Sequence, residues 1–225
     1  MKRIFTLLCL MGLSITVFAQ EDKPTPNKPV SPEVGALRTA ASLAKYGYAN
    51  YSATALLEAA SIIANTPVTD MKADVTHGES DVAAAEKEQK VSFDPQVLVA
   101  DALKFAGKDK TVAAVAKGVE RDIKNASTRG AVGGANYHRD RVLAKTTDTY
   151  NVKFRGGELA QVAVVGDGDT DLDLYIYDEN MNLIVSDTTY GDDCLCEWVP
   201  SWTGVFFIKV KNLGSVYNEY IIMTN

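Results

Sequence analysis

Hydrophobic residues recur at two different spacings along this chain, and the change of spacing divides it into two parts. From position 31 to about position 125 the apolar residues, many of them alanine, recur every three or four positions, which predicts amphipathic α-helices. From position 147 onward they alternate with polar residues, which predicts short β-strands. We therefore predict an α+β protein of two domains, in which an Ala-rich helical bundle precedes an antiparallel β-sandwich.

The helical part is expected to contain four helices in two similar hairpins. Ser31 and Asp94 each precede a proline, and a capping side chain followed by proline is favoured where a helix begins. Ser52 and Asp109 are candidate caps for the second helix of each hairpin, and residues 81–89 allow a further short helix. Two hairpins are fewer than the three or more repeats of a stable solenoid. A compact four-helix bundle is therefore predicted.

Seven strands are expected in the last part of the chain. They are separated by turns rich in glycine, asparagine and aspartate, which are residues that favour turns. Seven short strands in about 80 residues are typical of an antiparallel β-sandwich. The expected strands cover residues 149–154, 159–165, 171–177, 183–187, 194–198, 205–211 and 219–223.

The first residues have the three parts of a secretory signal peptide. Lys2 and Arg3 give a positive start, an apolar stretch that includes Cys9 follows, and Val17 and Ala19 are small residues at the positions that a signal peptidase requires. The apolar stretch is shorter than the roughly 20 residues that span a bilayer. We therefore expect a periplasmic or secreted protein with no membrane span after cleavage.

These patterns divide the chain into five segments. Three prolines after the cleavage site predict an extended tether, and glycines with basic residues before the strands predict a connector. The predicted segments are a signal peptide at 1–19, a Pro-rich tether at 20–30, a helical domain at 31–125, a Gly-rich basic connector at 126–146 and a β-sandwich at 147–225.

Composition narrows the range of partners. The 225 residues include 23 lysines and arginines against 29 aspartates and glutamates, which gives a net charge of −6. A nucleic-acid backbone attracts basic surfaces, so no nucleic-acid partner is expected. The 46% of hydrophobic and 23% of charged residues are ordinary for a globular protein.

The stretch from Asp169 to Asn180, DTDLDLYIYDEN, resembles the bacterial pre-peptidase C-terminal (PPC) domain, and the segment from Trp202 to Val210 agrees with it. The resemblance covers residues 147–225. It implies a small β-sandwich of the kind appended to secreted proteases and other exoenzymes, and related collagen-binding modules bind matrix protein and calcium. The helical part resembles no family and carries no peptidase signature, so neither protease activity nor collagen binding is carried over to this chain.

An acidic run precedes the third expected strand. Calcium takes six to eight oxygen ligands, and alternate residues of an extended segment project to the same side. The run is therefore a candidate calcium site, and a second acidic pair would complete its shell if both loops lie at one end of the sandwich. The alternative is a solvated acidic turn, because such turns are common and complete coordination shells are not. The candidate ligands are Asp167, Asp169, Asp171 and Asp173, with Asp192 and Asp193 as the second pair.

Cys194 and Cys196 are the thiols that remain after signal cleavage. An oxidising compartment favours a disulfide between them. On a regular strand, however, their Cα atoms would lie nearly 7 Å apart, at the limit for a bridge. Two alternatives therefore stay open, a strained disulfide at a bulge and two buried reduced cysteines.

His77 and His138 lie in different segments, a polar loop and the basic connector. No nucleophile signature accompanies His77, and catalysis needs an oriented partner. We therefore expect a solvated surface histidine there. A zinc site is not expected, because both histidines lie in segments other than that of the cysteines.

Tyr175 and Tyr177 share a strand face with Asp171 and Asp173. Such a face suits glycan or peptide binding if the helices leave it uncovered. We predict a non-enzymatic, exported binding or accessory module that recognises a protein or polysaccharide of the cell envelope or the extracellular space. Calcium is the one candidate cofactor, and no catalytic residue is identified.

Two alternatives remain. The protein could be an envelope enzyme whose site lies between the domains and uses His77 or His138 with nearby acids. It could also be a structural scaffold that assembles through its helical hairpins. The enzyme alternative requires a polar cleft that contains a histidine, whereas a binding module requires an exposed aromatic patch.

Overall fold

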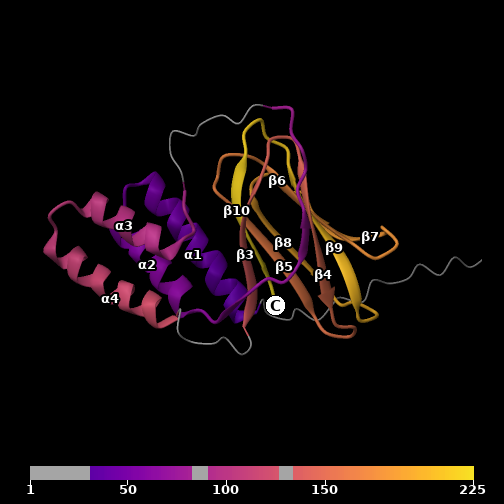
Figure 1. Ribbon diagram of the computed structural model, residues 1–225, viewed down its shortest axis with the longest axis horizontal. Helices are drawn as coiled ribbons and strands as arrows, with labels where there is room; N and C mark the ends of the chain where they lie inside the picture. The colour runs from indigo at the N-terminus through magenta and orange to yellow at the C-terminus, as the bar shows by residue number, and fades with distance from the viewer. Residues whose placement is uncertain (1–30, 83–90, 127–133) are drawn as a thin grey trace, which may run out of the picture.

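The computed structural model describes residues 31–82, 91–126 and 134–225. The predicted signal peptide (1–19), the predicted tether (20–30) and most of the predicted short helix at 81–89 lie outside these residues. Within the described ranges, no helix is both long enough and apolar enough to span a bilayer. Figure 1 shows the helices gathered on one side of two β-sheets.

All four predicted helices are present. The hydroxyl oxygens of Ser31 and Ser52 accept hydrogen bonds from backbone N–H groups three residues later, and the carboxylates of Asp94 and Asp109 accept from groups two and three residues later. These caps satisfy donors that a helix leaves unpaired at its start, so the local sequence suffices to place the four starts. The helices are α1 (Pro32–Ala49), α2 (Ala53–Asn65), α3 (Pro95–Ala106) and α4 (Lys110–Ala126).

The seven predicted strands are confirmed, each within two residues of its expected ends. Most have buried apolar side chains at alternate positions, which is the periodicity that predicted them. They are β4 (Thr147–Phe154), β5 (Ala160–Gly166), β6 (Leu172–Tyr177), β7 (Leu183–Asp187), β8 (Asp193–Trp198), β9 (Gly204–Asn212) and β10 (Asn218–Thr224).

Three further strands were not predicted: β1 (Val68–Asp70), β2 (Asp74–Thr76) and β3 (Ala135–Val142). The first two are too short to show a period. In β3 the two buried residues stand at its ends and polar residues fill the middle, so apolar alternation is missing. Residues 126–146 therefore do not form only a connector, because they contain a strand of the sandwich.

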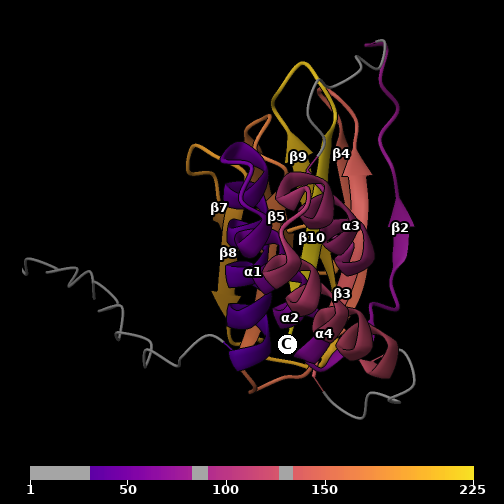
Figure 2. The same cartoon turned by 90° about the vertical axis from the view of Figure 1, so that its left-hand side faces the viewer.

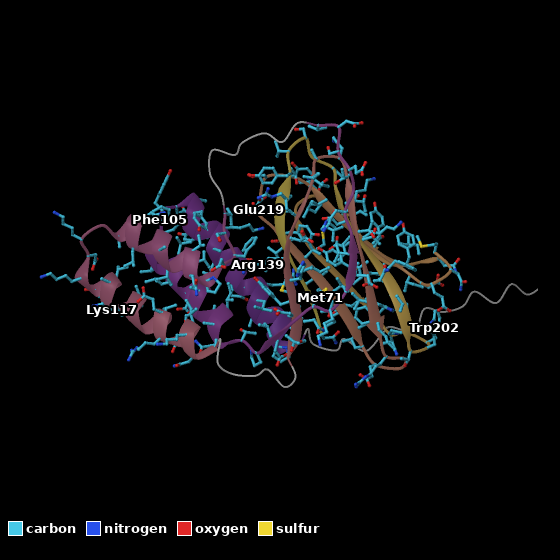
Figure 3. All side chains as sticks on the ribbon, in the orientation of Figure 1. Met71, Phe105, Lys117, Arg139, Trp202 and Glu219 are labelled. Carbon is cyan, nitrogen blue, oxygen red and sulfur yellow. The ribbon has the colours of Figure 1, made fainter. Side chains whose placement is uncertain are left out.

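The strands form two five-stranded sheets. We call them sheet A, with the order β1-β3-β10-β5-β8, and sheet B, with the order β2-β4-β9-β6-β7. Strand β1 runs parallel to β3, and the other pairs are antiparallel. Residues 71–73 cross from the edge of sheet A to the edge of sheet B, and the side chains of Met71 and Ala73 pack on the core between the sheets (Figure 3). The chain thereby closes one long edge of the sandwich.

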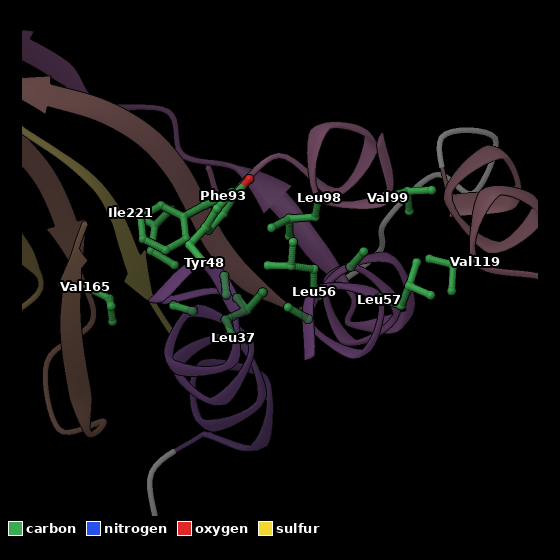
Figure 4. Packing of buried hydrophobic residues seen from close by; sticks show 14 of the residues in the cluster. Leu37, Tyr48, Leu56, Leu57, Phe93, Leu98, Val99, Val119, Val165 and Ile221 are labelled. Atoms are coloured by element: carbon green, nitrogen blue, oxygen red, sulfur yellow. The ribbon is translucent and has the colours of Figure 1, made fainter. Parts of the chain in front are cut away.

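The hydrophobic core has two layers. One cluster lies between the two sheets. The other lies between the helices and the outer side of sheet A, where Val165 and Ile221 pack with residues of the helices such as Leu37 and Tyr48 (Figure 4). Sheet A is therefore covered on both faces, and the helices and the sandwich share one apolar cluster. Seen along the helical side, all four helices lie over sheet A (Figure 2), and no described helix lies on the outer face of sheet B.

Candidate functional site

The closed edge of the sandwich holds a group of polar side chains that face one another between the sheets. We call this group the edge cluster. It comes from the segment after β2 and from strands β3, β4 and β10. Its members are His77, His138, Asp140, Asp148, Tyr150 and Tyr220.

Strand register brings these residues together. Strand β2 pairs with β4 so that Thr76 lies opposite Thr149, and continuing this register places His77 opposite Asp148. In sheet A, Asp140 lies directly opposite Tyr220. Directly opposite residues share a face of the sheet, so an acid from each sheet points into the same space.

A glycine permits the close approach that His77 needs. A Cβ atom on Gly78 would lie 2.7 Å from Cβ of Thr146 and 2.9 Å from the backbone nitrogen of Thr147. A side chain at this position would push the segment away from the start of β4. Because His77 is the preceding residue, Gly78 helps to hold it against Asp148.

Two tyrosine hydroxyls link the carboxylates of the edge cluster. The hydroxyl of Tyr220 donates to Oδ2 of Asp148 at 3.0 Å, and that of Tyr150 donates to Oδ2 of Asp140 at 2.7 Å. The two hydroxyls lie 2.5 Å apart. Burial raises the pKa values of both tyrosines, so both remain protonated donors at neutral pH.

The histidines lie on the open side of these carboxylates. Nδ1 of His77 is 3.2 Å from Oδ1 of Asp148, and its Nε2 is 3.9 Å from Oδ2 of Asp140. Nε2 of His138 is 3.6 Å from the same oxygen of Asp140. The sheet topology thus brings both histidines, which lie in different segments of the sequence, to the same carboxylate.

Asp148 is the most buried acid of the edge cluster, with a side chain that is 1% exposed. Burial raises its pKa, and the hydrogen bond from Tyr220 and the nearby His77 only partly oppose this. Its Oδ1 atom is buried and accepts no hydrogen bond. Histidine, cysteine and acidic side chains are the usual protein ligands of metal ions. Among the described residues, His77, Asp140 and Asp148 form the one group of three or more such side chains whose ligand atoms lie close enough to share an ion.

A cavity of about 420 Å³ lies beside the edge cluster, between the start of α3 and strands β3 and β10. Its charged residues pair across it or along its wall, Arg139 with Asp94 at 2.6 Å and Arg141 with Glu219 at 2.5 Å (Figure 3). The enzyme alternative requires a histidine in such a cleft. The lining consists of Ser92, Phe93, Asp94, Arg139, Asp140, Arg141, Glu219 and Tyr220.

The predicted calcium ligands lie at one end of the sandwich, and we call them the rim cluster: Asp167, Asp169, Asp171, Asp173, Asp192 and Asp193. The two acidic loops do meet there, because the backbone N–H of Gly166 donates to the carbonyl of Asp192 and that of Leu172 donates to Gly191. Calcium binding itself stays a prediction.

Most carboxylates of the rim cluster accept hydrogen bonds from nearby donors. Asp167 accepts from the backbone N–H of Glu219 at 2.9 Å, Asp171 from that of Gly191 at 2.8 Å, and Asp173 from the Tyr175 hydroxyl at 2.8 Å.

The second acidic pair of the rim cluster binds a lysine of helix α1. Asp192 accepts from the backbone N–H of Gly168. Lys45 lies 3.0 Å from Asp192 and 2.9 Å from Asp193. The rim cluster therefore ties the helices and loops to the sandwich.

Cys194 and Cys196 are free thiols that point into the core between the sheets. Their Sγ atoms lie near the carbonyl oxygens of Leu172 and Leu174. Strand β8 pairs with β5 in unbroken register, so the bulge that a disulfide would need is missing. Burial raises the pKa of Cys196 to about 12.

The outer face of sheet B carries the aromatic residues that the sequence placed on one strand face. The rings of Tyr175 and Tyr177 are stacked, with centroids 6.3 Å apart and an interplanar angle of 28°. The ammonium group of Lys209 lies 5.0 Å from the centre of the Tyr177 ring. Phe207 lies opposite Tyr177 on β9. We call these four residues, together with Lys211, the outer aromatic face.

Comparison with known proteins gives structural similarities only. No protein-family model matches the chain, and no curated protein matches its sequence. The chain is similar to the PPC domain of a collagenase from Bacillus anthracis, with 11% identity over 42% of this chain and 91% of that one and a TM-score of 0.34.

Other solved structures show similarity of the same extent. The periplasmic inhibitor PliG of g-type lysozyme from Aeromonas hydrophila matches with 10% identity over 40% of this chain and 84% of that one, at a TM-score of 0.33. A carbohydrate-binding module of a lichenase from Cellvibrio mixtus, solved with cellotriose, matches with 10% identity over 40% and 86% of the two chains, at a TM-score of 0.26.

Sequence reasoning missed the edge cluster. Asp148 and Tyr150 occupy alternate inward positions of β4, and the polar residue at such a position was the available signal. The expected strand began one residue after Asp148, which hid it.

Proposed function

We propose that the protein is an exported, non-enzymatic binding module that holds an acidic polysaccharide on its outer aromatic face. The observation that carries this proposal is the placement of the four described helices, which lie over sheet A and not over the outer face of sheet B. A binding module requires an uncovered aromatic face, and this is where one lies. Export is the prediction made from the first 19 residues.

The outer aromatic face has the chemistry of a sugar-binding surface. Tyrosine rings combine a flat apolar surface with a polar hydroxyl, which matches a sugar ring with its C–H faces and hydroxyl edges. The Tyr175 hydroxyl donates to Asp173 at 2.8 Å, and this hydrogen bond fixes the orientation of the ring. It also raises the pKa of Tyr175 to about 12, so the ring stays neutral under physiological conditions.

Charge favours an acidic polymer over a neutral one. Lys209 and Lys211 follow each other on the outward side of β9, opposite Tyr175 and Asp173 of β6. These two lysines lie side by side on this face, in a chain whose net charge is −6. Carboxylates or sulfates on alternate sugars would meet these ammonium groups while the sugar rings stack on the tyrosines.

Affinity electrophoresis of the mature chain in gels containing polygalacturonate or a neutral β-glucan tests this proposal. We expect retardation in the acidic gel, and we expect Tyr175→Ala with Tyr177→Ala to weaken binding at least tenfold, because burying a ring contributes about 1.5–3 kcal/mol. Tyr46→Ala is the matched control, since Tyr46 is 58% exposed on α1. Equal binding by the double tyrosine variant and by Tyr46→Ala would contradict a polysaccharide ligand. A chain that binds proteins of an envelope extract but is retarded by neither polysaccharide gel would contradict it as well.

A further inference from the structure

The edge cluster contains a buried polar atom that the protein does not satisfy. Oδ1 of Asp148 accepts no hydrogen bond, although the side chain is 1% exposed and its other oxygen accepts from Tyr220. An unsatisfied buried carboxylate oxygen is costly. This atom faces the ring of His77, so it is directed into the space that the cluster encloses.

The charge of the edge cluster is also unbalanced. Asp140 and Asp148 form ion pairs only with histidines among the described residues. The nearest arginines, Arg139 and Arg141, pair instead with Asp94 and Glu219. Within the part of the chain that the structure describes, these two carboxylates share the edge without a lysine or arginine partner, and a divalent cation would neutralise both.

The spacing of the ligand atoms suits a small transition-metal ion. Zinc binds nitrogen and oxygen ligands at about 2.0–2.2 Å, which places tetrahedral ligand atoms about 3.3 Å apart. His77 Nδ1 lies 3.2 Å from Asp148 Oδ1, and His138 Nε2 lies 3.6 Å from Asp140 Oδ2. One ligand atom each from His77, Asp140 and Asp148 can be chosen with all three within 4.8 Å.

We propose that the edge cluster binds a divalent transition-metal ion, zinc being the best fit, through His77, Asp140 and Asp148. His138 lies 3.6 Å from Asp140 but is not part of this group of three. This site is separate from the outer aromatic face and from the rim cluster, and it goes beyond the proposed polysaccharide binding.

The surrounding residues hold the candidate ligands in place. Tyr220 and Tyr150 donate to Asp148 and Asp140, and the backbone N–H of Arg141 donates to Oδ1 of Asp140 at 2.8 Å. Outer-shell hydrogen bonds of this kind orient metal ligands and strengthen binding. His77 is 53% exposed, so its ring is the one that turns to admit the ion.

The ligand set distinguishes zinc from calcium. Calcium prefers six to eight oxygen ligands, whereas imidazole nitrogen favours zinc, copper, nickel and related ions. A bound ion would join the segment after β2 to strands β3 and β4. It would therefore pin the crossover that closes the edge of the sandwich, and the ion acts as a structural clamp.

Titration calorimetry and thermal melting of the metal-free mature chain, prepared without a histidine tag, test the proposal. We expect one zinc ion per chain and a rise in Tm of at least about 4 °C at saturating zinc. Cobalt(II) should give the visible absorption of a tetrahedral site. His77→Ala and Asp148→Asn should each weaken zinc binding at least tenfold, and circular dichroism checks that both variants fold.

Asp169→Asn is the matched control, because Asp169 is exposed in the rim cluster, and it should bind zinc as the wild type does. Calcium is the comparison ion. If calcium raises Tm and the double variant Asp171→Asn with Asp173→Asn abolishes this rise, calcium binds at the predicted rim site. That result has no bearing on zinc binding at the edge cluster. Zinc binding that is absent, or that survives both His77→Ala and Asp148→Asn, overturns the proposal. Loss of polysaccharide binding alone does not bear on it.

Discussion

The rim cluster and the edge cluster are both rich in aspartate, yet they satisfy their carboxylates in opposite ways. At the rim, Asp167 accepts a hydrogen bond from a backbone N–H group of β10, Asp171 and Asp192 accept from backbone N–H groups of neighbouring loops, and Lys45 adds an ion pair. At the edge, Asp148 keeps a buried oxygen without a donor. The two clusters therefore differ in how far the protein itself supplies donors to their carboxylates.

The difference follows from how each cluster is assembled. Asp167, Asp171 and Asp192 lie in loops that pack against one another and against β10, so a backbone N–H group from another segment reaches each carboxylate. The edge acids lie on strands, whose own N–H groups already bond to neighbouring strands. Their remaining partners are side chains from distant segments, namely the tyrosines and the histidines. These partners leave Oδ1 of Asp148 without a hydrogen-bond donor.

Removing the most connected rim carboxylate should have the largest effect on stability. Asp192→Ala takes away the acceptor of the Gly168 N–H and one of two partners of the half-buried Lys45. We expect the free energy of unfolding to fall by about 2–3 kcal/mol, measured by urea denaturation. Asp193→Ala removes the more exposed partner of the same lysine and should cost less than about 1 kcal/mol. A loss below about 1 kcal/mol in both variants would show that the rim contributes little to stability.

The same chemical change should have opposite signs in the two clusters. Asp148→Asn removes a buried negative charge that stands near Asp140, and the amide oxygen can still accept from Tyr220, so we expect metal-free protein to gain roughly 1 kcal/mol at pH 7. Asp167→Asn leaves the N–H of Glu219 or Asp169 facing an amide N–H group, which should cost about 1–2 kcal/mol. Chemical denaturation in the presence of a chelator measures both. Destabilisation by both variants would remove the contrast between the clusters.

Periodicity explains which parts of this fold are predictable. Strands β4 to β10 and the helices carry their burial pattern in the local sequence, and four capping residues mark the helix starts. Strand β3 shows no apolar alternation because both of its faces are polar. Its inward residues, His138 and Asp140, belong to the edge cluster, and its outward arginines pair with Asp94 and Glu219.

The candidate sites divide in the same way. The outer aromatic face was visible as two tyrosines on one strand, since neighbours two residues apart share a face. The edge cluster was not, because His77, Asp140 and Asp148 meet only through the pairing of β2 with β4 and of β3 with β10. No local signal carries that register, and the three-residue strand β2 is too short to predict.

The smallest expected effect is a pH dependence at Asp187, which lies beside the rim cluster at the end of β7. Burial alone would raise its pKa, but the backbone N–H of Leu195 and the hydroxyl and N–H of Thr189 outweigh burial and lower it. The folded protein therefore holds this carboxylate ionised more firmly than the unfolded chain does. Its stabilising contribution is present above the ordinary pKa of 3.8 and is lost as the pH falls through the lower folded value.

Urea denaturation of the wild type and Asp187→Asn between about pH 5 and pH 2 measures this contribution. The difference in the free energy of unfolding between the two proteins should shrink as the pH falls, by less than about 1 kcal/mol, because the partly exposed carboxylate is screened by solvent. A difference that grows toward low pH would mean that Asp187 is destabilised in the fold. Asp187 would then behave like Asp148, whose pKa burial raises, and the rim would lose its distinction from the edge.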